Sequence, residues 1–315
     1  MNYQDFCNHV MYKVKDIMGN EYEVSLIKAD KVNGITFISL TILKKGETVA
    51  PNIYLESYYS EYENGVQLSL IVDNIVSFYY SVDKKPILPT FLLSDFDNVK
   101  DRLYCKLINY NKNISLLSAV PHIKWMDLAI IFCVLVSNDP NGISSITVKF
   151  DLFEQWGVTV ETIYATALTN TPLLFEPTVK SMDDIISSLV SEQPSWPNDC
   201  ESFDEIIMDM LQQNKSGDNR KLMFVAGNIL GIYGASWLLQ KDELNDISNS
   251  LDGNLFILPS SIHEVIIIPF TKEISTKNLL QMVCAVNATQ VSPEDFLSDN
   301  VYLYTRENDT LLPLF

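Results

Sequence analysis

The order of apolar patterns in the C-terminal third constrains the fold more than any other feature of the sequence. Short apolar runs typical of strands alternate there with segments in which apolar residues recur every three to four positions, as in amphipathic helices. Strands are expected at 221–226, 254–258, 263–269 and 300–305, and helices at 236–251 and 275–287. This βαββαβ order matches the split-βαβ arrangement of ferredoxin-like domains, so we expect a C-terminal βαββαβ domain over 219–315.

The preceding part of the chain also mixes strands with helices. The Asn33-Gly34 pair is a strong hairpin signal because both positions of a tight turn need positive φ, and it separates expected strands at 22–30 and 35–43. A helix over 159–170 should end before Pro172, because proline lacks the N–H that a helix interior requires. The chain is therefore expected to be an α+β protein with mixed or antiparallel sheets and packed helices. Residues 1–190 are expected to form its N-terminal α+β domain.

The composition changes after Ser181. Eight acidic residues and no basic residue lie between Ser181 and Asn214, and two prolines interrupt the helical period. Such a segment is typical of a solvated connection between domains. We expect residues 191–218 to form an acidic linker or a flexible insertion.

The charge balance excludes several classes of partner. The chain has 22 basic and 40 acidic side chains, a net charge of −18. A field of this sign repels phosphate backbones and anionic membranes, so we expect no nucleic acid and no membrane as a partner. A protein partner with a basic surface remains compatible with it. The apolar run at 128–136 is too short to span a bilayer, and the charged N-terminus is unlike a signal peptide, so a cytoplasmic location is expected.

The sequence also lacks the spacings of metal and cofactor sites. Its five cysteines are scattered without a C-x-x-C pair, and its three histidines form no H-x-x-x-H pair. Gly227, Gly231 and Gly234 lie between an expected strand and helix, where glycines can cradle a phosphate, but no Gly-Lys-Ser/Thr ending follows. We interpret these glycines as a turn with close packing, and we expect no metal and no cofactor.

Two hydroxyls, an imidazole and a carboxylate lie together in the sequence PSSIHEV. If this group were catalytic, Ser260 or Ser261 would be the nucleophile, His263 the base and Glu264 its orienting acid, as in a hydrolase. Successive strand residues point to opposite faces, and no G-x-S-x-G turn presents either serine. We therefore favour a structural turn ahead of a buried strand, and keep the hydrolase as the alternative.

A second group of candidates is rich in tyrosine, which combines apolar area with a polar tip and is enriched at protein interfaces. Either a core stripe or a binding surface would explain this segment. The candidate binding residues are Tyr54, Glu56, Tyr58, Tyr59, Tyr62 and, further along the chain, His122.

Five stretches together resemble one protein family. They are APNIYLESYYSEYENG at 50–65, VPHIKWMDLAIIF at 120–132, WGVTVETIYATALTNTP at 156–172, LFILPSSIHEVIIIP at 255–269 and NVYLYTRE at 300–307. In this order they are similar to the bacterial domain-of-unknown-function 5688 family. The resemblance implies an origin in gut anaerobic Firmicutes, often near mobile elements, and implies no catalytic residues. Taken with the acidic charge, it leads us to expect a non-catalytic protein-binding or regulatory module.

Overall fold

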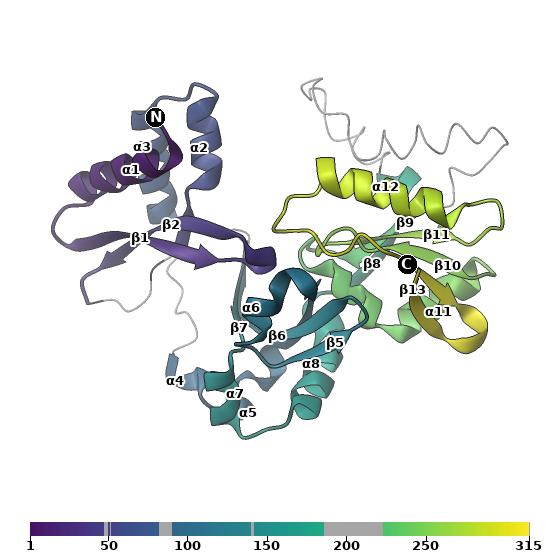
Figure 1. The fold of residues 1–315 in the computed structure, drawn as a ribbon. Coiled ribbons are helices and arrows are strands. Elements are labelled where there is room, and N and C mark those ends of the chain that lie inside the picture. The colour runs from purple at the N-terminus through teal and green to yellow at the C-terminus, as the bar shows by residue number, and fades with distance from the viewer. Residues whose placement is uncertain (47–49, 51, 82–89, 140–141, 186–222, 315) are drawn as a thin grey trace. The chain divides into compact units, whose positions relative to one another are not determined.

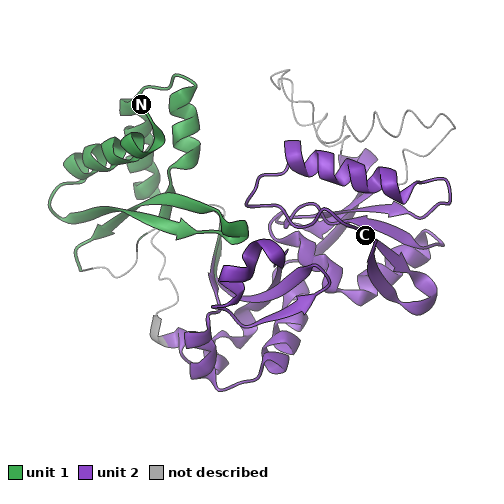
Figure 2. Cartoon of the chain, in the orientation of Figure 1, with its two compact units in different colours: residues 1–90, 136–144 green, residues 91–135, 145–315 purple. Residues whose placement is uncertain are grey.

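The computed structural model describes the chain except residues 47–49, 51, 82–89, 140–141, 186–222 and 315. The described residues form two compact units (Figure 2): unit 1 contains residues 1–90 and 136–144, and unit 2 contains 91–135 and 145–315. The expected linker at 191–218 lies outside the described residues, so the domain division drawn around it stays a prediction. The boundary between the two compact units lies near Thr90 instead, and residues 136–144 belong to unit 1 again.

Unit 1 is a three-stranded antiparallel sheet, in the order β1-β2-β3, with three helices. Its elements are α1 (Tyr3–Met18), β1 (Tyr22–Asp30), the 3-10 turn η1 (Val32–Gly34), β2 (Thr36–Lys44), β3 (Asn52–Tyr54), α2 (Glu56–Glu63) and α3 (Leu68–Ser81). Asn33 has φ 62° and Gly34 has φ 70°, as the hairpin prediction required. The predicted hairpin is confirmed.

One apolar stripe of α1 forms the centre of the unit 1 core. Phe6, Val10 and Val14 recur at helical spacing, are fully buried, and belong to one cluster with Leu40 of β2 and Ile71 of α3. The helix begins at a proper cap, because the Asn2 side chain accepts the Asp5 N–H at 2.9 Å.

The first sheet of unit 2 has the order β4-β6-β5, with β7 paired to β6, and the adjoining ends of β6 and β7, within residues 136–144, belong to unit 1. Its strands are β4 (Leu103–Asn109), β5 (His122–Trp125), β6 (Leu128–Asp139) and β7 (Gly142–Thr147). The helical segments around it are α4 (Thr90–Leu93), α5 (Phe96–Val99), η2 (Lys100–Arg102), η3 (Asn111–Asn113), α6 (Ile114–Leu117), α7 (Phe150–Trp156) and α8 (Val160–Leu174).

The prediction that the helix ends before Pro172 is wrong, because Pro172 lies inside α8. Proline removes only one helical hydrogen bond there, close to the C-terminal end, and the neighbouring residue anchors the helix. The Thr171 hydroxyl donates to the Ala167 carbonyl at 2.6 Å and accepts the Cys105 N–H of β4 at 3.0 Å. The hydrogen bond between α8 and β4 thus outweighs the local preference of the helix to end before proline.

The second sheet of unit 2 is antiparallel throughout, in the order β13-β12-β10-β11-β9-β8. Its elements are β8 (Pro177–Ser181), β9 (Phe224–Asn228), η5 (Gly234–Leu239), α11 (Lys241–Ser250), β10 (Leu255–Leu258), β11 (Val265–Pro269), α12 (Thr276–Thr289), β12 (Val301–Thr305), η6 (Arg306–Asn308) and β13 (Thr310–Leu314). The α+β class and the βαββαβ order are confirmed.

The strand order refines the ferredoxin-like description. The fourth strand of the repeat, β12, pairs with the second, β10, whereas in a ferredoxin-like sheet it lies beside the first. Two split βαβ units result: β11 separates β9 from β10, and β10 separates β11 from β12. The strands β8 and β13 extend the sheet at its two edges.

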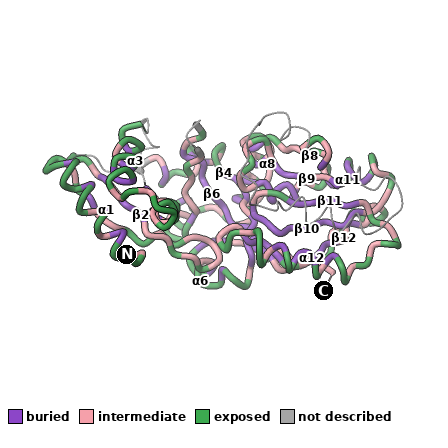
Figure 3. Tube along the Cα trace, turned by 90° about the horizontal axis from the view of Figure 1, so that it is seen from above, coloured by how far each residue is buried: buried purple, intermediate pink, exposed green. Residues whose placement is uncertain are grey.

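One face of this sheet is covered by α12 (Figure 1). Leu279, Met282 and Val283 of the helix belong to one buried cluster with Phe256 of β10 and Ile266 of β11. The central strands β10 and β11 are buried almost throughout (Figure 3), so their near-continuous apolar sequences reflect cover on both faces.

A carboxylate joins the two sheets of unit 2. Asp127 lies in the turn before β6 and accepts hydrogen bonds from the Ser298 hydroxyl at 2.6 Å and the Asn300 amide at 2.9 Å. Its other oxygen accepts the Tyr302 hydroxyl of β12 at 2.5 Å. Burial, together with the negative charge of Asp127, raises the pKa of Tyr302 above its usual range.

Every helix within the described ranges is too short or too polar to cross a lipid bilayer.

Candidate functional site

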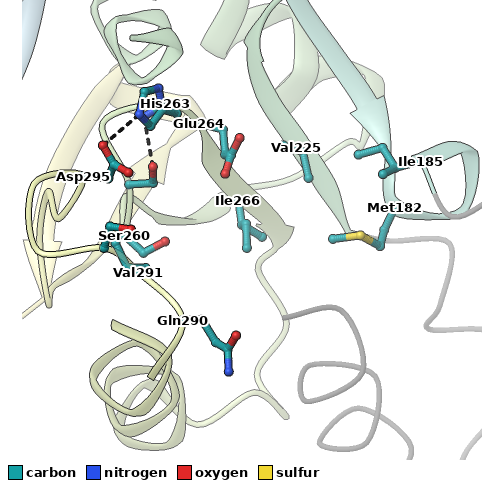
Figure 4. Close-up of a pocket in the computed structure, with 12 residues that line it drawn as sticks. Met182, Ile185, Val225, Ser260, His263, Glu264, Ile266, Gln290, Val291 and Asp295 are labelled. Atoms are coloured by element: carbon teal, nitrogen blue, oxygen red, sulfur yellow. Dashed lines mark hydrogen bonds and ion pairs between the residues drawn. The ribbon is translucent and has the colours of Figure 1, made fainter. Parts of the chain in front are cut away.

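The turn between β10 and β11 carries the PSSIHEV residues and is held by a second segment of the chain. The Ile262 N–H donates to the Asp295 carbonyl at 2.8 Å, and the Leu297 N–H donates to the Ser260 carbonyl at 2.9 Å. An isolated antiparallel bridge links Ser261 with Phe296 between these bonds. This pairing brings the Asp295 side chain next to the turn (Figure 4).

The imidazole of His263 is hydrogen-bonded through both nitrogens. Nε2 lies 2.9 Å from Asp295 Oδ1, and Nδ1 accepts the Tyr233 backbone N–H at 3.3 Å. Since Nδ1 is an acceptor, Nε2 carries the proton and donates it to Asp295, which leaves the ring neutral and the carboxylate negative. The two side chains are 28% and 32% exposed.

Aromatic stacking fixes the same ring. Tyr233 stacks on His263 with centroids 5.9 Å apart and an interplanar angle of 16°, and on Tyr104 with centroids 6.4 Å apart. The Lys106 ammonium lies 3.8 Å from the Tyr233 centroid, a cation–π distance. The imidazole therefore has little freedom to reorient.

The glycine-rich turn contacts the turn that carries His263. A Cβ on Gly234 would lie 2.3 Å from the His263 carbonyl oxygen and 2.8 Å from the Gly227 Cα, far inside van der Waals contact. Gly234 is therefore required for the close approach of two backbone segments. This packing favours the interpretation of these glycines as structural over a phosphate cradle.

Neither serine forms a nucleophile–base pair with the imidazole. Ser261 Oγ accepts the His263 backbone N–H at 3.0 Å. Ser260 is 7% exposed and lines a cavity, and its hydroxyl has no hydrogen-bond partner among the described residues. The carboxylate that orients the imidazole is Asp295, whereas Glu264, expected in that role, is exposed.

The cavity beside this group has a volume of about 410 Å³. Among the described residues that line it, Glu264 and Asp295 carry carboxylates. Its other lining side chains come from the helix that begins at 182, from β9, β11 and the ends of two turns: Met182, Ile185, Val225, Ser260, Ser261, His263, Ile266, Gln290, Val291 and Ser292. Figure 4 shows Asp295 and Ser260 on one side, Met182, Ile185 and Val225 on the other, and Glu264 between them.

The tyrosine-rich candidates lie in unit 1, where they support its core. Tyr58, Tyr59 and Tyr62 are partly buried against the core cluster, and the rings of Tyr59 and Tyr62 lie 5.3 Å and 5.4 Å from Phe6. Tyr54 lies under the Lys31 ammonium, 3.8 Å from its centroid. These contacts are typical of a row of residues that packs on the core, with partly exposed residues at its edge.

The other two binding candidates also have local partners. Glu56 Oε1 accepts the Tyr3 hydroxyl at 2.6 Å and the Ile38 N–H at 2.8 Å, and so ties α1, β2 and α2 together. His122 Nδ1 lies 3.0 Å from the Val120 carbonyl oxygen. Neither residue lines the cavity described above.

Sequence reasoning did not find Asp295, Tyr233 or Gln290. Asp295 follows His263 by 32 residues, with helix α12 between them, and no local spacing links the two. A usable signal was the polar sequence SPED after the predicted helix, because a turn at that end of α12 must return the chain to the sheet.

No cluster of three or more histidine, cysteine or acidic side chains with metal-binding geometry occurs among the residues that the structure describes.

Comparison with known proteins classifies the chain. A model described as a family of unknown function (DUF5688) matches residues 3–306. The chain belongs to this family. The resemblance carried by the five sequence stretches is thereby confirmed. Searches of curated proteins and of solved structures found no match. Membership of the DUF5688 family assigns no activity, so the function of this DUF5688 chain must be argued from the cavity.

Proposed function

We propose that the chain is a non-catalytic protein-binding module, and that the cavity beside His263 receives a positively charged part of the partner. One observation carries the proposal: the imidazole has both nitrogens occupied, while the described lining of the cavity beside it includes the carboxylates of Glu264 and Asp295. With His263 neutral, the negative charge of Asp295 at the cavity is not cancelled by the ring.

The geometry favours binding over catalysis. A general base needs a nitrogen within hydrogen-bond reach of the nucleophile, and both nitrogens of His263 bond to other groups. Ser261 uses its hydroxyl to accept a backbone N–H. A hydroxyl so placed stabilises the turn and is not activated for attack.

The charge of the whole chain supports the same kind of partner. A net charge of −18 attracts basic surfaces and speeds their encounter, and the effect weakens as salt screens it. The carboxylates of the cavity would then position the partner after encounter.

The test compares partner capture from cell lysate by the wild type and by a cavity variant, Glu264→Gln with Asp295→Asn, at low and moderate salt. The control is Glu154→Gln with Asp246→Asn, which removes the same two charges from exposed positions outside the cavity. We expect a partner that the wild type and the control retain and the cavity variant loses. Equal capture by all three proteins would refute the proposal.

A hydrolase remains the second candidate because one observation favours it. The imidazole is 28% exposed and has an acid, Asp295, contributed from elsewhere in the chain. This function requires Nδ1 to release the Tyr233 N–H and accept a proton from Ser260 or Ser261. Hydrolysis of an ester that is abolished in both His263→Ala and one serine→Ala variant would support it, and unchanged hydrolysis in these variants would exclude it.

A further inference from the structure

Unit 2 contains a second, much smaller cavity that shares no described lining residue with the cavity beside His263. It lies where the C-terminal end of α8 and the start of β8 meet the end of β9 and η5. Its volume is about 10 Å³, which is the space of a single water-sized sphere. Any group bound inside it must therefore be very small.

Two buried N–H donors belong to the lining of this small cavity. The Trp237 side chain is 3% exposed, and its Nε1–H has no acceptor among the described residues. The amide nitrogen Nε2 of Gln240 is likewise buried, and the described part of the chain offers it no acceptor. Buried donors are normally hydrogen-bonded, and both residues border the same cavity. One acceptor inside the cavity would satisfy both donors.

The Gln240 amide is not used by the helix that follows it. Gln240 occupies the N-cap of α11, a position where Ser, Thr, Asp or Asn side chains usually accept a backbone N–H. Its side chain makes no capping hydrogen bond. The amide is therefore available to the cavity.

Size and charge decide which acceptor fits the small cavity. A chloride ion would need positive charge nearby, whereas none of the described residues that line the cavity is charged and the chain carries a net charge of −18. A water molecule has the right size and needs no opposite charge. Water also suits either orientation of the Gln240 amide, because it donates as well as accepts.

The protons of such a water need acceptors, and two lining residues provide them. The Ser236 hydroxyl donates to the Tyr233 carbonyl at 2.9 Å, which leaves its own lone pairs as acceptors. Asn228 Oδ1 accepts the Leu230 N–H at 3.0 Å and can accept a second hydrogen bond. Buried waters make about three hydrogen bonds, and this lining can supply that number.

We propose that the small cavity is a binding site for one buried water molecule, which accepts hydrogen bonds from Trp237 Nε1 and Gln240 Nε2. Gly234 lines the same cavity and lies against the His263 carbonyl, so the water belongs to the packing that holds the His263 turn. The inference is independent of the proposed function.

The experiment measures cross-relaxation between water and the indole N–H protons of the full chain by NMR, and Trp→Phe variants assign the two signals. Trp156 is a matched control within the chain, because it is only 8% exposed and its Nε1 donates to the Leu93 carbonyl at 2.7 Å. We expect a water cross-peak at the Trp237 indole proton and none at that of Trp156. The peak should have opposite signs in NOE and ROE spectra, as cross-relaxation with a long-lived water requires. No such peak at Trp237, or equal peaks at both residues, would overturn the inference.

The variant Gln240→Met tests whether the water is shared by the two donors. It keeps the length of the side chain and removes the amide, so the water cross-peak of Trp237 should weaken. An unchanged Trp156 indole signal would show that the variant folds. A Trp237 cross-peak of unchanged intensity would contradict the proposal, because a signal relayed through an exchanging hydroxyl would not depend on Gln240.

Replacement of sodium chloride by sodium bromide distinguishes water from an anion. We expect the chemical shift of the Trp237 indole proton to be the same in both salts. A shift confined to Trp237 would assign the site to a halide ion and reject the water.

Discussion

Removal of the Asp127 carboxylate should destabilise unit 2 strongly, although Asp127 lies in a turn. The variant Asp127→Ala leaves three donors without their acceptor, and two of them, Ser298 and Tyr302, are fully buried. A buried donor left unsatisfied costs about 1–3 kcal/mol, and water can replace the acceptor for the partly exposed Asn300. We therefore expect the free energy of unfolding to fall by about 3 kcal/mol.

Urea unfolding followed by circular dichroism measures this change. With a slope of about 3 kcal/mol per molar urea, the midpoint should fall by about 1 M. The control is Asp97→Ala, which removes an aspartate that is 79% exposed and pairs with Lys100 at 2.8 Å. Such a surface pair contributes little, so its midpoint should hardly move. Equal effects of the two variants would show that Asp127 does not join the sheets as described.

Alkaline titration gives the same variant a second readout. The pKa of Tyr302 is raised in the folded protein, so its protonated hydroxyl favours folding at neutral pH, and this contribution is lost as pH rises above about 10. Asp127→Ala removes one cause of the raised pKa. The variant should therefore ionise Tyr302 at lower pH than the wild type, as measured by ultraviolet absorbance.

Two further perturbations test the core of unit 2 and the chain's thiols. Gly234→Ala should prevent normal packing of the His263 turn and lower the melting temperature by several degrees, whereas Gly253→Ala, whose nearest neighbour would be 3.8 Å away, should not; equal melting temperatures would contradict the close approach. In a Cys200→Ser background, an alkylating reagent should modify the exposed Cys284 first. Burial shields the other thiols from the reagent, and it raises the pKa of the Cys105 thiol to about 12. Peptide mapping by mass spectrometry would refute this if native protein were labelled equally at the buried thiols, which are Cys7, Cys105 and Cys133.

Features of the fold that depend on neighbouring residues could be predicted from the sequence. The positive φ angles at Asn33 and Gly34 follow from the turn that this pair prefers, and the β10 and β11 runs are apolar because both faces are covered. Pro172 was mispredicted because the bond from Cys105 to Thr171 lies between distant segments. The pairing of β12 with β10 is likewise set by tertiary packing, and no pattern within one segment of the sequence predicts it.

The candidate site could be predicted from local sequence even less completely than the fold. The PSSIHEV residues attracted attention by their types, but the bonds that decide their role come from elsewhere. Tyr233 precedes His263 by 30 residues and Asp295 follows it by 32. Their backbone bonds to the turn depend on how α12 and the glycine-rich turn pack, which no spacing within one segment encodes.

The pairing of β8 with β9 fixes the two ends of the segment between them. Ser181 and Phe224 are register partners, and the Met182 N–H donates to the Met223 carbonyl at 2.9 Å, so the chain leaves the sheet and returns to it at one point. The entropy of closing a loop grows only slowly with its length. The pairing of β8 with β9 thus holds the two ends of this connection side by side, whatever its length.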